Sequence, residues 1–378
     1  MKAGFKKAFL WLIFFGNLCC IFLLLMGNAA TLLNPARWWP VAFAGILFPL
    51  LLITTLLFAL FWLFMQSKKA LYSSAAILLS IPHIISTFAF NFPSAFHQAK
   101  EPRNVRIITW NVGLMNYTAG DSATASTNNK FIFKQLQEAD ADIICLQEFF
   151  TAVTPGKQYN FLDSISRTLN YPYHYFSRDN AKFNASFFSG SIIFSRYKII
   201  DTLKIVFPKP FEGSIIKAGI LINNDTIDIF TTRLQPFRFQ SNEYKELHDI
   251  KSGSDAGFTG SKNIISKLRL AYKLKAEQVL LAKNLIAESK RPKIFTGDLN
   301  DVPVSFAYSE LKNEMADVWI SKGKGLGRTF KFISPTLRID DIFYNHYFKA
   351  SQVTRIMADK ASDHNGVVAD LLLIKKEQ

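Results

Sequence analysis

The sequence contains few cysteines, only three among 378 residues. Cys19 and Cys20 lie within an apolar run near the N-terminus, and Cys145 lies in a run that predicts a buried strand. Beyond the apolar N-terminal region, no two cysteines are present that could pair as a disulfide. This cysteine usage therefore neither supports nor excludes an oxidising compartment.

Acidic residues are also scarce: there are 29 Asp and Glu residues against 44 Lys and Arg residues, which gives a formal net charge of +15. Such a balance suits acidic partners, for example phosphate polymers or anionic lipid head groups. A solvated basic surface beside a negatively charged membrane is the alternative. One basic cluster lies on a predicted helix, where we expect it to form the exposed face: Lys262, Lys267, Arg269, Lys273 and Lys275.

Charge is almost absent from residues 8 to about 95. A helix needs about 20 apolar residues to cross a bilayer. Short polar breaks divide this region into three apolar runs, at 8–26, 41–65 and 71–90. The third run contains Pro82 and His83 and is the least regular.

A signal peptide is the alternative for the first run, because lysines precede it and the small residues at 27–30 resemble a cleavage site. The two further runs favour membrane helices instead. A buried helical bundle is a poor alternative, since the runs have no polar face. We therefore expect residues 1–95 to form a transmembrane segment of about three helices, residues 96–102 to form a linker, and residues 103–378 to form a separate domain.

Basic residues near the apolar runs predict the orientation, because cytoplasmic loops carry more Lys and Arg. The side that we expect to be cytoplasmic carries Lys2, Lys6, Lys7, Lys68 and Lys69. The opposite side carries fewer basic residues by a small margin: Arg37, Lys100, Arg103 and Arg106. With three crossings, the sequence predicts an integral membrane protein whose second domain lies outside the cytoplasm.

Several apolar runs beyond the linker have amide, carboxylate or imidazole groups at one end. The polar residues concerned are Asn111 after 107–110, Glu148 after 142–147, Asp298 and Asn300 after 293–296, and Asp363 and His364 before 366–371. Side chains carried on strand ends gather at the rim of a sheet. This arrangement predicts a functional site at such a rim.

These runs belong to a set of stretches that together resemble a known superfamily. The stretches are Thr-Trp-Asn-Val at 109–112, Leu-Gln-Glu at 146–148, Ser-Gly-Ser-Ile-Ile-Phe-Ser-Arg at 189–196, Gly-Asp-Leu-Asn-Asp at 297–301, Arg-Ile-Asp at 338–340 and Ser-Asp-His at 362–364. On this basis residues from about 103 to 374 resemble the endonuclease/exonuclease/phosphatase superfamily. The resemblance implies an α/β fold, a deoxyribonuclease-like two-sheet α/β sandwich with the site at one end of the sheets.

Local patterns give a coarse secondary structure for this domain. Strands are predicted at 105–110, 142–147, 191–195, 214–222, 226–233, 292–297, 340–344 and 367–373. Apolar residues at helical spacing predict a helix at 262–288, and the Gly- and Ser-containing stretch at 252–257 predicts a mobile loop.

The resemblance implies a metal site built from oxygen ligands. Glu148 is the metal glutamate, helped by Asn111 and Asp363. Mg²⁺, or Mn²⁺ in its place, is the implied ion, since hard divalent ions prefer oxygen ligands and neutralise charge that develops on a phosphate ester. The alternative for Glu148 is a strand-end carboxylate that faces solvent.

The remaining site residues have catalytic roles by the same resemblance. Asp298 positions or deprotonates water, and Asn300 is a donor that orients the phosphate. His364 is expected to pair with Asp340 rather than Asp341, because alternation along a strand sends neighbouring residues to opposite faces. A carboxylate on one imidazole nitrogen fixes the tautomer of the ring. A local Asx turn is the alternative for Asp298 and Asn300, and a structural histidine is the alternative for His364.

The sequence departs from the superfamily pattern at Arg233, which stands where many members carry a histidine. Arginine cannot act as a general acid near neutral pH, because its pKa stays above about 12. Arginine can still hold a phosphate oxygen through paired N–H groups. A second, smaller departure is Asn365-Gly366 after the Ser-Asp-His stretch.

The sequence therefore predicts a membrane-anchored, metal-dependent phosphoric ester hydrolase. The reaction expected is hydrolysis of phosphodiester bonds by in-line attack of an activated water. Nucleic acid and phospholipid both remain candidate substrates, because the membrane segment favours lipid and the basic charge suits either. The alternative function is a catalytically impaired scaffold that binds phosphate or lipid, because Arg233 replaces the usual histidine.

Overall fold

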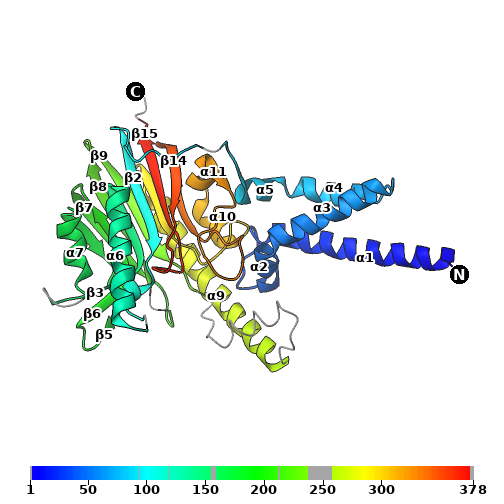
Figure 1. Cartoon of the computed structure of the whole chain (residues 1–378), viewed down its shortest axis with the longest axis horizontal. Helices are drawn as coiled ribbons and strands as arrows, with labels where there is room; N and C mark the ends of the chain where they lie inside the picture. The colour runs from blue at the N-terminus through cyan, green and yellow to red at the C-terminus, as the bar shows by residue number, and fades with distance from the viewer. Residues whose placement is uncertain are drawn as a thin grey trace.

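The computed structural model describes residues 2–92, 94–118, 120–154, 159–211, 213–236 and 258–374. A rod of helices leads into a pair of packed sheets that helices cover on both sides (Figure 1). The loop predicted at 252–257 and the side chains of Lys262 and Lys267 lie outside the described residues.

The rod begins with α1 (Lys2–Ala29), whose segment Gly4–Ala29 has a hydropathy of 2.5 and is long and apolar enough to cross a membrane. The second and third apolar runs each form two helices joined at a bend. They form α2 (Trp39–Ile46) with α3 (Phe48–Phe64), bent by 68°, and α4 (Ala70–Leu79) with α5 (Ile81–Thr87), bent by 57°. The described chain thus has one helix able to span a membrane, or up to three if each bent pair is one span.

Proline explains both bends. Pro49 and Pro82 stand in the first turns of α3 and α5. A proline lacks the N–H that continues a helix and fits the start of a new one. The third run also ends early, because Ala89–Phe90 forms strand β1, which pairs with β12 (Lys324–Gly325).

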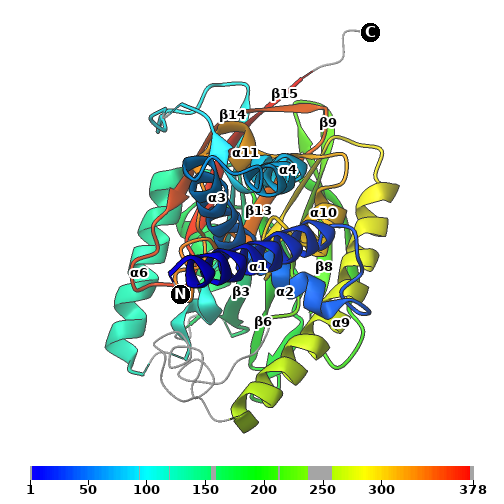
Figure 2. The same ribbon diagram turned by 90° about the vertical axis from the view of Figure 1, so that its right-hand side faces the viewer.

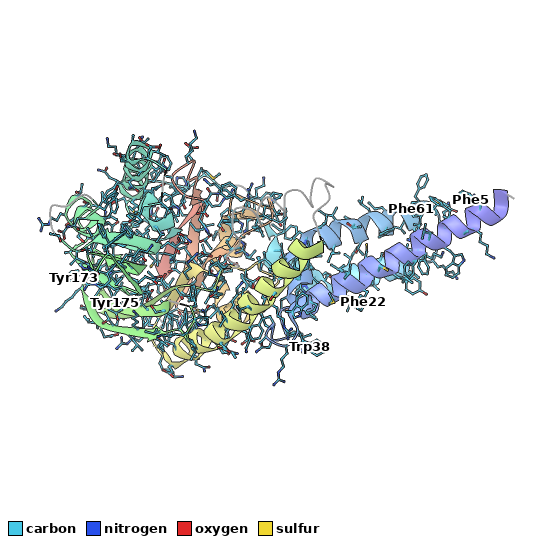
Figure 3. The ribbon with its side chains drawn as sticks, turned by 90° about the horizontal axis from the view of Figure 1, so that it is seen from below. Phe5, Phe22, Trp38, Phe61, Tyr173 and Tyr175 are labelled. Atoms are coloured by element: carbon cyan, nitrogen blue, oxygen red, sulfur yellow. The ribbon has the colours of Figure 1, made fainter. Side chains whose placement is uncertain are left out.

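Aromatic side chains stand out from the rod. Figure 3 shows Phe5 and Phe22 projecting from α1 and Trp38 near the base of the rod, and all three are exposed. Contiguous exposed apolar surface of this extent is rare on monomeric soluble domains. The rod therefore has the surface that contact with lipid requires.

Two sheets form the centre of the domain beyond the rod. The six-stranded sheet has the order β11-β13-β10-β9-β8-β7: Ala316–Asp317, Asp340–Tyr344, Lys293–Asp298, Asp225–Arg233, Ser214–Ile222 and Ile199–Val206. The seven-stranded sheet has the order β14-β15-β2-β3-β6-β4: Phe348–Ile356, Gly366–Leu373, Asn104–Asn111, Ile143–Ala152, Phe187–Ser195 and Tyr173–Phe176. Its remaining strand, β5 (Asn180–Lys182), pairs with β6.

Branched aliphatic side chains fill the space between the sheets. Ile107 and Ile143 of one sheet meet Ile229 and Ile294 of the other in a fully buried cluster. β-Branched residues favour the extended backbone and pack well on pleated surfaces. The inner faces are therefore held together mainly by apolar burial.

Helices cover both outer faces. Figure 2 shows α6 (Ser122–Ala139) and α9 (Phe258–Glu288) on opposite sides of the sandwich. Ile132 of α6 packs on the seven-stranded sheet, and Val279 of α9 packs on the six-stranded sheet. α7 (Phe161–Thr168) and α10 (Phe306–Lys312) extend these layers. The expectation of a two-sheet α/β sandwich is confirmed.

Candidate active site

Strand register places three polar residues in a row on the six-stranded sheet. Asp298, the last residue of β10, pairs with Arg233 on β9 and with Asp340 on β13. Asp298 and Asp340 are buried, and the Arg233 side chain is partly exposed. The three side chains therefore meet at the ends of three neighbouring strands, β9, β10 and β13.

A β-bulge supplies the carboxylate of the other sheet. The pairing of β3 with β6 shifts register between Leu146 and Phe149, and Glu148 within the bulge has φ 50°. The preceding Gln147 stays buried between the sheets, where its Nε2 donates to Thr231 Oγ1 at 2.9 Å. Because a bulge redirects a side chain without moving the rest of the strand, Glu148 reaches the rim while Gln147 remains inside.

Asn111 and Arg233 join the two halves of this site. Asn111 Nδ2 donates to Glu148 Oε1 at 3.1 Å and to Asp298 Oδ2 at 3.0 Å. A guanidinium nitrogen of Arg233 lies 2.7 Å from Glu148 Oε1, and its Nε lies 3.7 Å from Asp298 Oδ2. Glu148 is thus held within the constellation and is not an isolated surface carboxylate.

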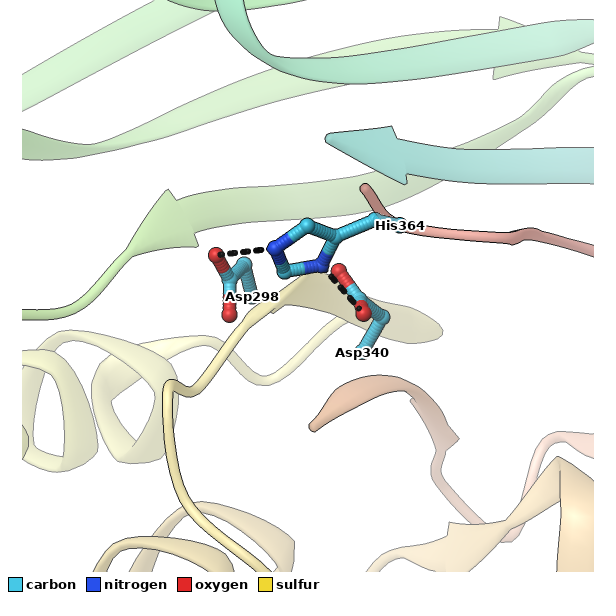
Figure 4. Close-up of side chains that lie close together, drawn as sticks. All are labelled: Asp298, Asp340 and His364. Atoms are coloured by element: carbon cyan, nitrogen blue, oxygen red, sulfur yellow. Dashed lines mark hydrogen bonds and ion pairs between the residues drawn. The ribbon is translucent and has the colours of Figure 1, made fainter. Parts of the chain in front are cut away.

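His364 forms a second link between the sheets (Figure 4). Its Nδ1 lies 2.8 Å from Asp340 Oδ2, and its Nε2 lies 4.0 Å from Asp298 Oδ2. Asp341 faces away and binds Arg338, as alternation along the strand predicted. Burial alone lowers the pKa of His364, but the carboxylates of Asp340 and Asp298 raise the pKa to about 10. Burial also raises the pKa of the Asp340 carboxyl.

Asp298 and Asn300 make the local turn and also belong to the site. Asp298 Oδ1 accepts from the Asn300 backbone N–H at 2.9 Å, which is the local bond of an Asx turn. The Asn300 Nδ2 group donates to Asp298 Oδ2 and to the Leu234 carbonyl oxygen. Asn300 therefore uses its amide to hold Asp298, and its role as a donor that orients the phosphate stays a prediction.

Two cavities meet at Glu148. One, of about 650 Å³, is lined by Glu148 together with Asp363, Lys331 and other residues. The other, of about 290 Å³, is lined by Glu148, Arg233 and Lys182 among others. Asp363 is exposed and lines the same cavity as Glu148, so the structure brings two of the three predicted metal ligands to one opening.

A left-handed turn separates these cavities. Residues 113–116 all have positive φ, between 51° and 55°, and the left-handed conformation costs about 1–2 kcal/mol for each residue that is not glycine. Buried Met115 and the Asn116 side chain, which donates to the Ala361 carbonyl oxygen at 2.9 Å, anchor the turn. Leu114 then lines both cavities.

A second group of candidate metal ligands lies deeper in the site. Among the described residues, one group of carboxylates and histidines has the spacing of a metal site: Asp298, Asp340 and His364, whose ligand atoms lie within 4.8 Å of one another. The 2.8 Å separation of His364 Nδ1 from Asp340 Oδ2 is that of a hydrogen bond. In this group, His364 Nδ1 is therefore already paired with Asp340.

Some residues that support the site were not given roles by sequence reasoning. The Trp110 indole N–H donates to the His364 carbonyl oxygen at 2.9 Å, and Ser362 Oγ donates to the Asn111 carbonyl oxygen at 2.7 Å. Trp110 and Ser362 both lie within stretches that resemble the superfamily, and those stretches could have identified them as site residues. Thr329, whose Oγ1 accepts from the Asp340 backbone N–H at 3.1 Å, lies outside any such stretch.

Lys275 corrects the sequence-based expectation for the basic cluster. Arg269 and Lys273 are exposed as expected, but Lys275 is 1% exposed. Its Nζ donates to the Asn300 carbonyl oxygen at 2.6 Å and to Asp301 Oδ2 at 3.1 Å. Burial lowers the pKa of Lys275 and raises the pKa of Asp301. Lys275 therefore braces the turn behind Asp298 and is not part of the exposed face of α9.

The smaller departure at Asn365 has a structural reason. Asn365 is buried, and its Oδ1 accepts from the Ala358 backbone N–H at 3.0 Å. Its own backbone N–H donates to the Thr329 carbonyl oxygen at 2.8 Å. Asn365 therefore ties together the two loops on either side of His364.

Comparison with known proteins gives matches over most of the chain. Residues 108–364 match the Endonuclease/Exonuclease/phosphatase family, and residues 9–87 match a domain of unknown function, DUF8431. No curated protein is similar in sequence.

Solved structures show the same fold. An endonuclease/exonuclease/phosphatase from Beutenbergia cavernae DSM 12333 has a TM-score of 0.52 at 19% identity, covering 72% of this chain and 72% of that one. The human Nocturnin catalytic domain with bound sulfate anion has a TM-score of 0.51 at 14% identity, covering 72% of this chain and 94% of that one. At these identities the similarity establishes the fold alone.

Proposed function

Since the chain belongs to the endonuclease/exonuclease/phosphatase family, in general hydrolases of phosphoester bonds, we propose that it is a membrane-anchored phosphodiesterase dependent on Mg²⁺ or Mn²⁺. The observation that carries the proposal is the meeting of Glu148, Asn111, Arg233, Asp298 and the His364–Asp340 pair at one end of two sheets. The intact His364–Asp340 pair favours an enzyme over a silent scaffold.

The residues at the opening fit a hard divalent ion. Glu148 and Asp363 offer carboxylate oxygens beside one cavity, and buried Asn111 donates to Glu148 Oε1 at 3.1 Å. Arg233 lies 2.7 Å from Glu148 Oε1, so the ion would share this carboxylate with the guanidinium. Mg²⁺ prefers oxygen ligands and usually keeps several of its bound waters, for which the cavity has room. When bound, the ion would neutralise charge on the phosphate oxygens.

Asp298 is the residue proposed to hold and deprotonate the attacking water. Its two carboxylate oxygens accept hydrogen bonds from Asn300 and Asn111, which fix the carboxylate in one orientation. His364 lies 4.0 Å from Asp298 and keeps its orientation through Asp340. In its protonated form His364 supplies positive charge beside the reacting phosphate, where developing negative charge needs stabilisation.

Arg233 is proposed to bind a non-bridging phosphate oxygen. Its side chain is partly exposed and lines the smaller cavity, and its Nε, 3.7 Å from Asp298 Oδ2, makes no hydrogen bond among the described residues. Arginine remains charged at neutral pH and cannot serve as a proton donor. Arg233 therefore contributes binding and charge, and the proton transfers fall to Asp298 and His364.

The substrate is proposed to be a phosphodiester of nucleic acid or phospholipid, and the helical rod is proposed to anchor the chain in a membrane. The exposed aromatic residues of α1 support the anchor. The distribution of basic residues supports a site outside the cytoplasm.

The test uses the full chain purified in detergent. Hydrolysis of bis(p-nitrophenyl) phosphate, single-stranded oligonucleotides and phospholipid vesicles would be compared with Mg²⁺, with Mn²⁺ and with a chelator. Turnover that needs the ion and is lost in Asp298→Asn supports the proposal. Phosphate-ester binding without any turnover would instead support a scaffold.

A further inference from the structure

The N-terminal helices pack directly against the segment that follows Asp298. Figure 1 shows α2 where the rod meets the sandwich. Gly45 of α2 faces Val304, and a Cβ atom at Gly45 would lie 2.3 Å from the Val304 carbonyl oxygen. The Val304 side chain is buried among residues of the rod, including Leu24 and Phe48. The loop after β10 therefore ends inside the helical part of the protein.

A second contact joins the rod to the segment that precedes Asp340. Ile46 of α2 packs against a small apolar cluster that draws members from both segments: Val302, Leu337 and Ile339. Arg338 is 1% exposed, and it donates to the Ser86 carbonyl oxygen at the end of α5 at 2.9 Å. A buried donor that loses its partner costs about 1–3 kcal/mol, so this contact resists separation of the two parts.

These segments are bonded to each other next to the site residues. The Leu299 backbone N–H donates to the Ile339 carbonyl oxygen at 2.7 Å. Leu299 directly follows Asp298, and Ile339 directly precedes Asp340. A displacement of either segment is therefore passed within one residue to a carboxylate of the site.

We infer that the N-terminal helices position the active site, and that Gly45 and Ile46 are positioning residues for Asp298 and Asp340. The inference rests on the proposed function, because positioning has a kinetic effect only if these carboxylates take part in the reaction. The rod is then a structural part of the enzyme in addition to its proposed role as an anchor.

Gly45→Ala in the full chain tests the inference. The added methyl group must push α2 away from Val304, because the obstructing atom belongs to the backbone. A misplacement of about 1 Å can cost about 100-fold in rate. We expect kcat for bis(p-nitrophenyl) phosphate to fall by about that factor, while KM stays near the wild-type value because Arg233 and the lysines of the cavities lie on other segments.

Two further measurements distinguish a displacement of the two loops from a general loss of folded structure. Hydrogen exchange should quicken in peptides that cover 299–305 and 337–341 but not in α6, and Mn²⁺ stoichiometry should remain that of the folded wild type. Gly16→Ala is the matched control, because a Cβ atom at Gly16 would meet only Phe58, at an ordinary 3.8 Å. Ile46→Ala, which removes contacts without adding a clash, replaces Gly45→Ala if that variant does not fold.

The outcomes distinguish the inference from the proposed function. A wild-type protein with no metal-dependent turnover overturns the proposed function. An active wild type with unchanged kcat in Gly45→Ala and Ile46→Ala overturns the inference alone, whether or not exchange quickens. Lower kcat with faster exchange in the two loops, and with neither change in Gly16→Ala, supports it.

Discussion

Asp340 begins β13 of the six-stranded sheet, His364 lies two residues before β15 of the seven-stranded sheet, and a bond of 2.8 Å between the imidazole Nδ1 and the carboxylate Oδ2 connects them. This bond leaves Nε2 turned toward Asp298 at 4.0 Å. The carboxylate of Asp340 therefore decides which imidazole nitrogen faces Asp298.

We expect Asp340→Asn to reduce kcat by about 10²- to 10⁴-fold, the range associated with a positioned acid or base. An amide at this position no longer attracts the imidazolium and permits the wrong tautomer. The measurement is steady-state kinetics with circular dichroism as a check on folding. Near-normal kcat in a folded variant would contradict the role assigned to this pair.

The stability of the metal-free protein should fall at alkaline pH because of His364. Its pKa of about 10 in the folded protein lies above the ordinary 6.5, so the folded state binds the extra proton more tightly. The resulting stabilisation is complete below about pH 6.5 and disappears as pH rises through about 10. Thermal unfolding with a chelator should show a gap between wild type and His364→Gln that narrows from pH 6 to pH 10. Parallel curves for the two proteins would refute this assignment.

Glu148→Gln should abolish metal-dependent turnover and weaken Mn²⁺ binding, because the ion loses a charged oxygen ligand. Titration calorimetry with Mn²⁺ measures the binding without reliance on activity. Glu138→Gln is the matched control, since Glu138 is an exposed residue of α6 that pairs with Lys134 at 3.7 Å. Equal Mn²⁺ affinity in Glu148→Gln and wild type would place the ion elsewhere.

Arg233→Gln should bind Mn²⁺ more tightly while its KM for phosphodiesters rises. The guanidinium at 2.7 Å competes with the ion for Glu148, and removing a partly exposed pair of this kind changes affinity by up to about 1 kcal/mol, or about fivefold. Arg196→Gln serves as the control, because Arg196 binds Asp140 beside the opposite end of β3. Weaker Mn²⁺ binding in Arg233→Gln would mean that Arg233 supports the metal site instead of competing with it.

The orientation of the chain can be read with reporter fusions. Alkaline phosphatase joined after Phe92 should be active, since the basic residues predict that this point lies outside the cytoplasm. A fluorescent protein that matures only in the cytoplasm should be dark at the same position. The reverse result would place the site in the cytoplasm and exclude external substrates.

Much of the site could be predicted because its residues lie at strand ends in short, recognisable stretches. The pairing of His364 with Asp340 followed from the resemblance at Arg-Ile-Asp, 338–340, and alternation along the strand excluded Asp341. The direction of the Glu148 side chain could not be derived in this way, because it depends on a bulge that breaks the alternation along β3. Lys275 was assigned to the exposed face of its helix because sequence alone does not show which turn of a helix meets a buried carboxylate.

The sequence did not predict helices and strands in which the pattern of apolar residues is weak or irregular. α6 begins Ser-Ala-Thr-Ala-Ser-Thr-Asn-Asn, a composition of low helix propensity that the Asp121 cap and packing of Ile132 overcome. β7 has an irregular burial pattern at the edge of its sheet, so it lacks regular alternation. The bends in the second and third apolar runs occur at Pro49 and Pro82. A hydropathy profile shows that a stretch is apolar but does not show that a proline bends its helix.

The division of the site between two sheets has a consequence for biosynthesis. Trp110 and His364, which contact each other, are 254 residues apart. A nascent chain therefore cannot complete the constellation until synthesis has passed His364 and both sheets have closed on one another. The growing polypeptide therefore carries separated fragments of a site, and its proposed hydrolytic activity begins only with the finished sandwich.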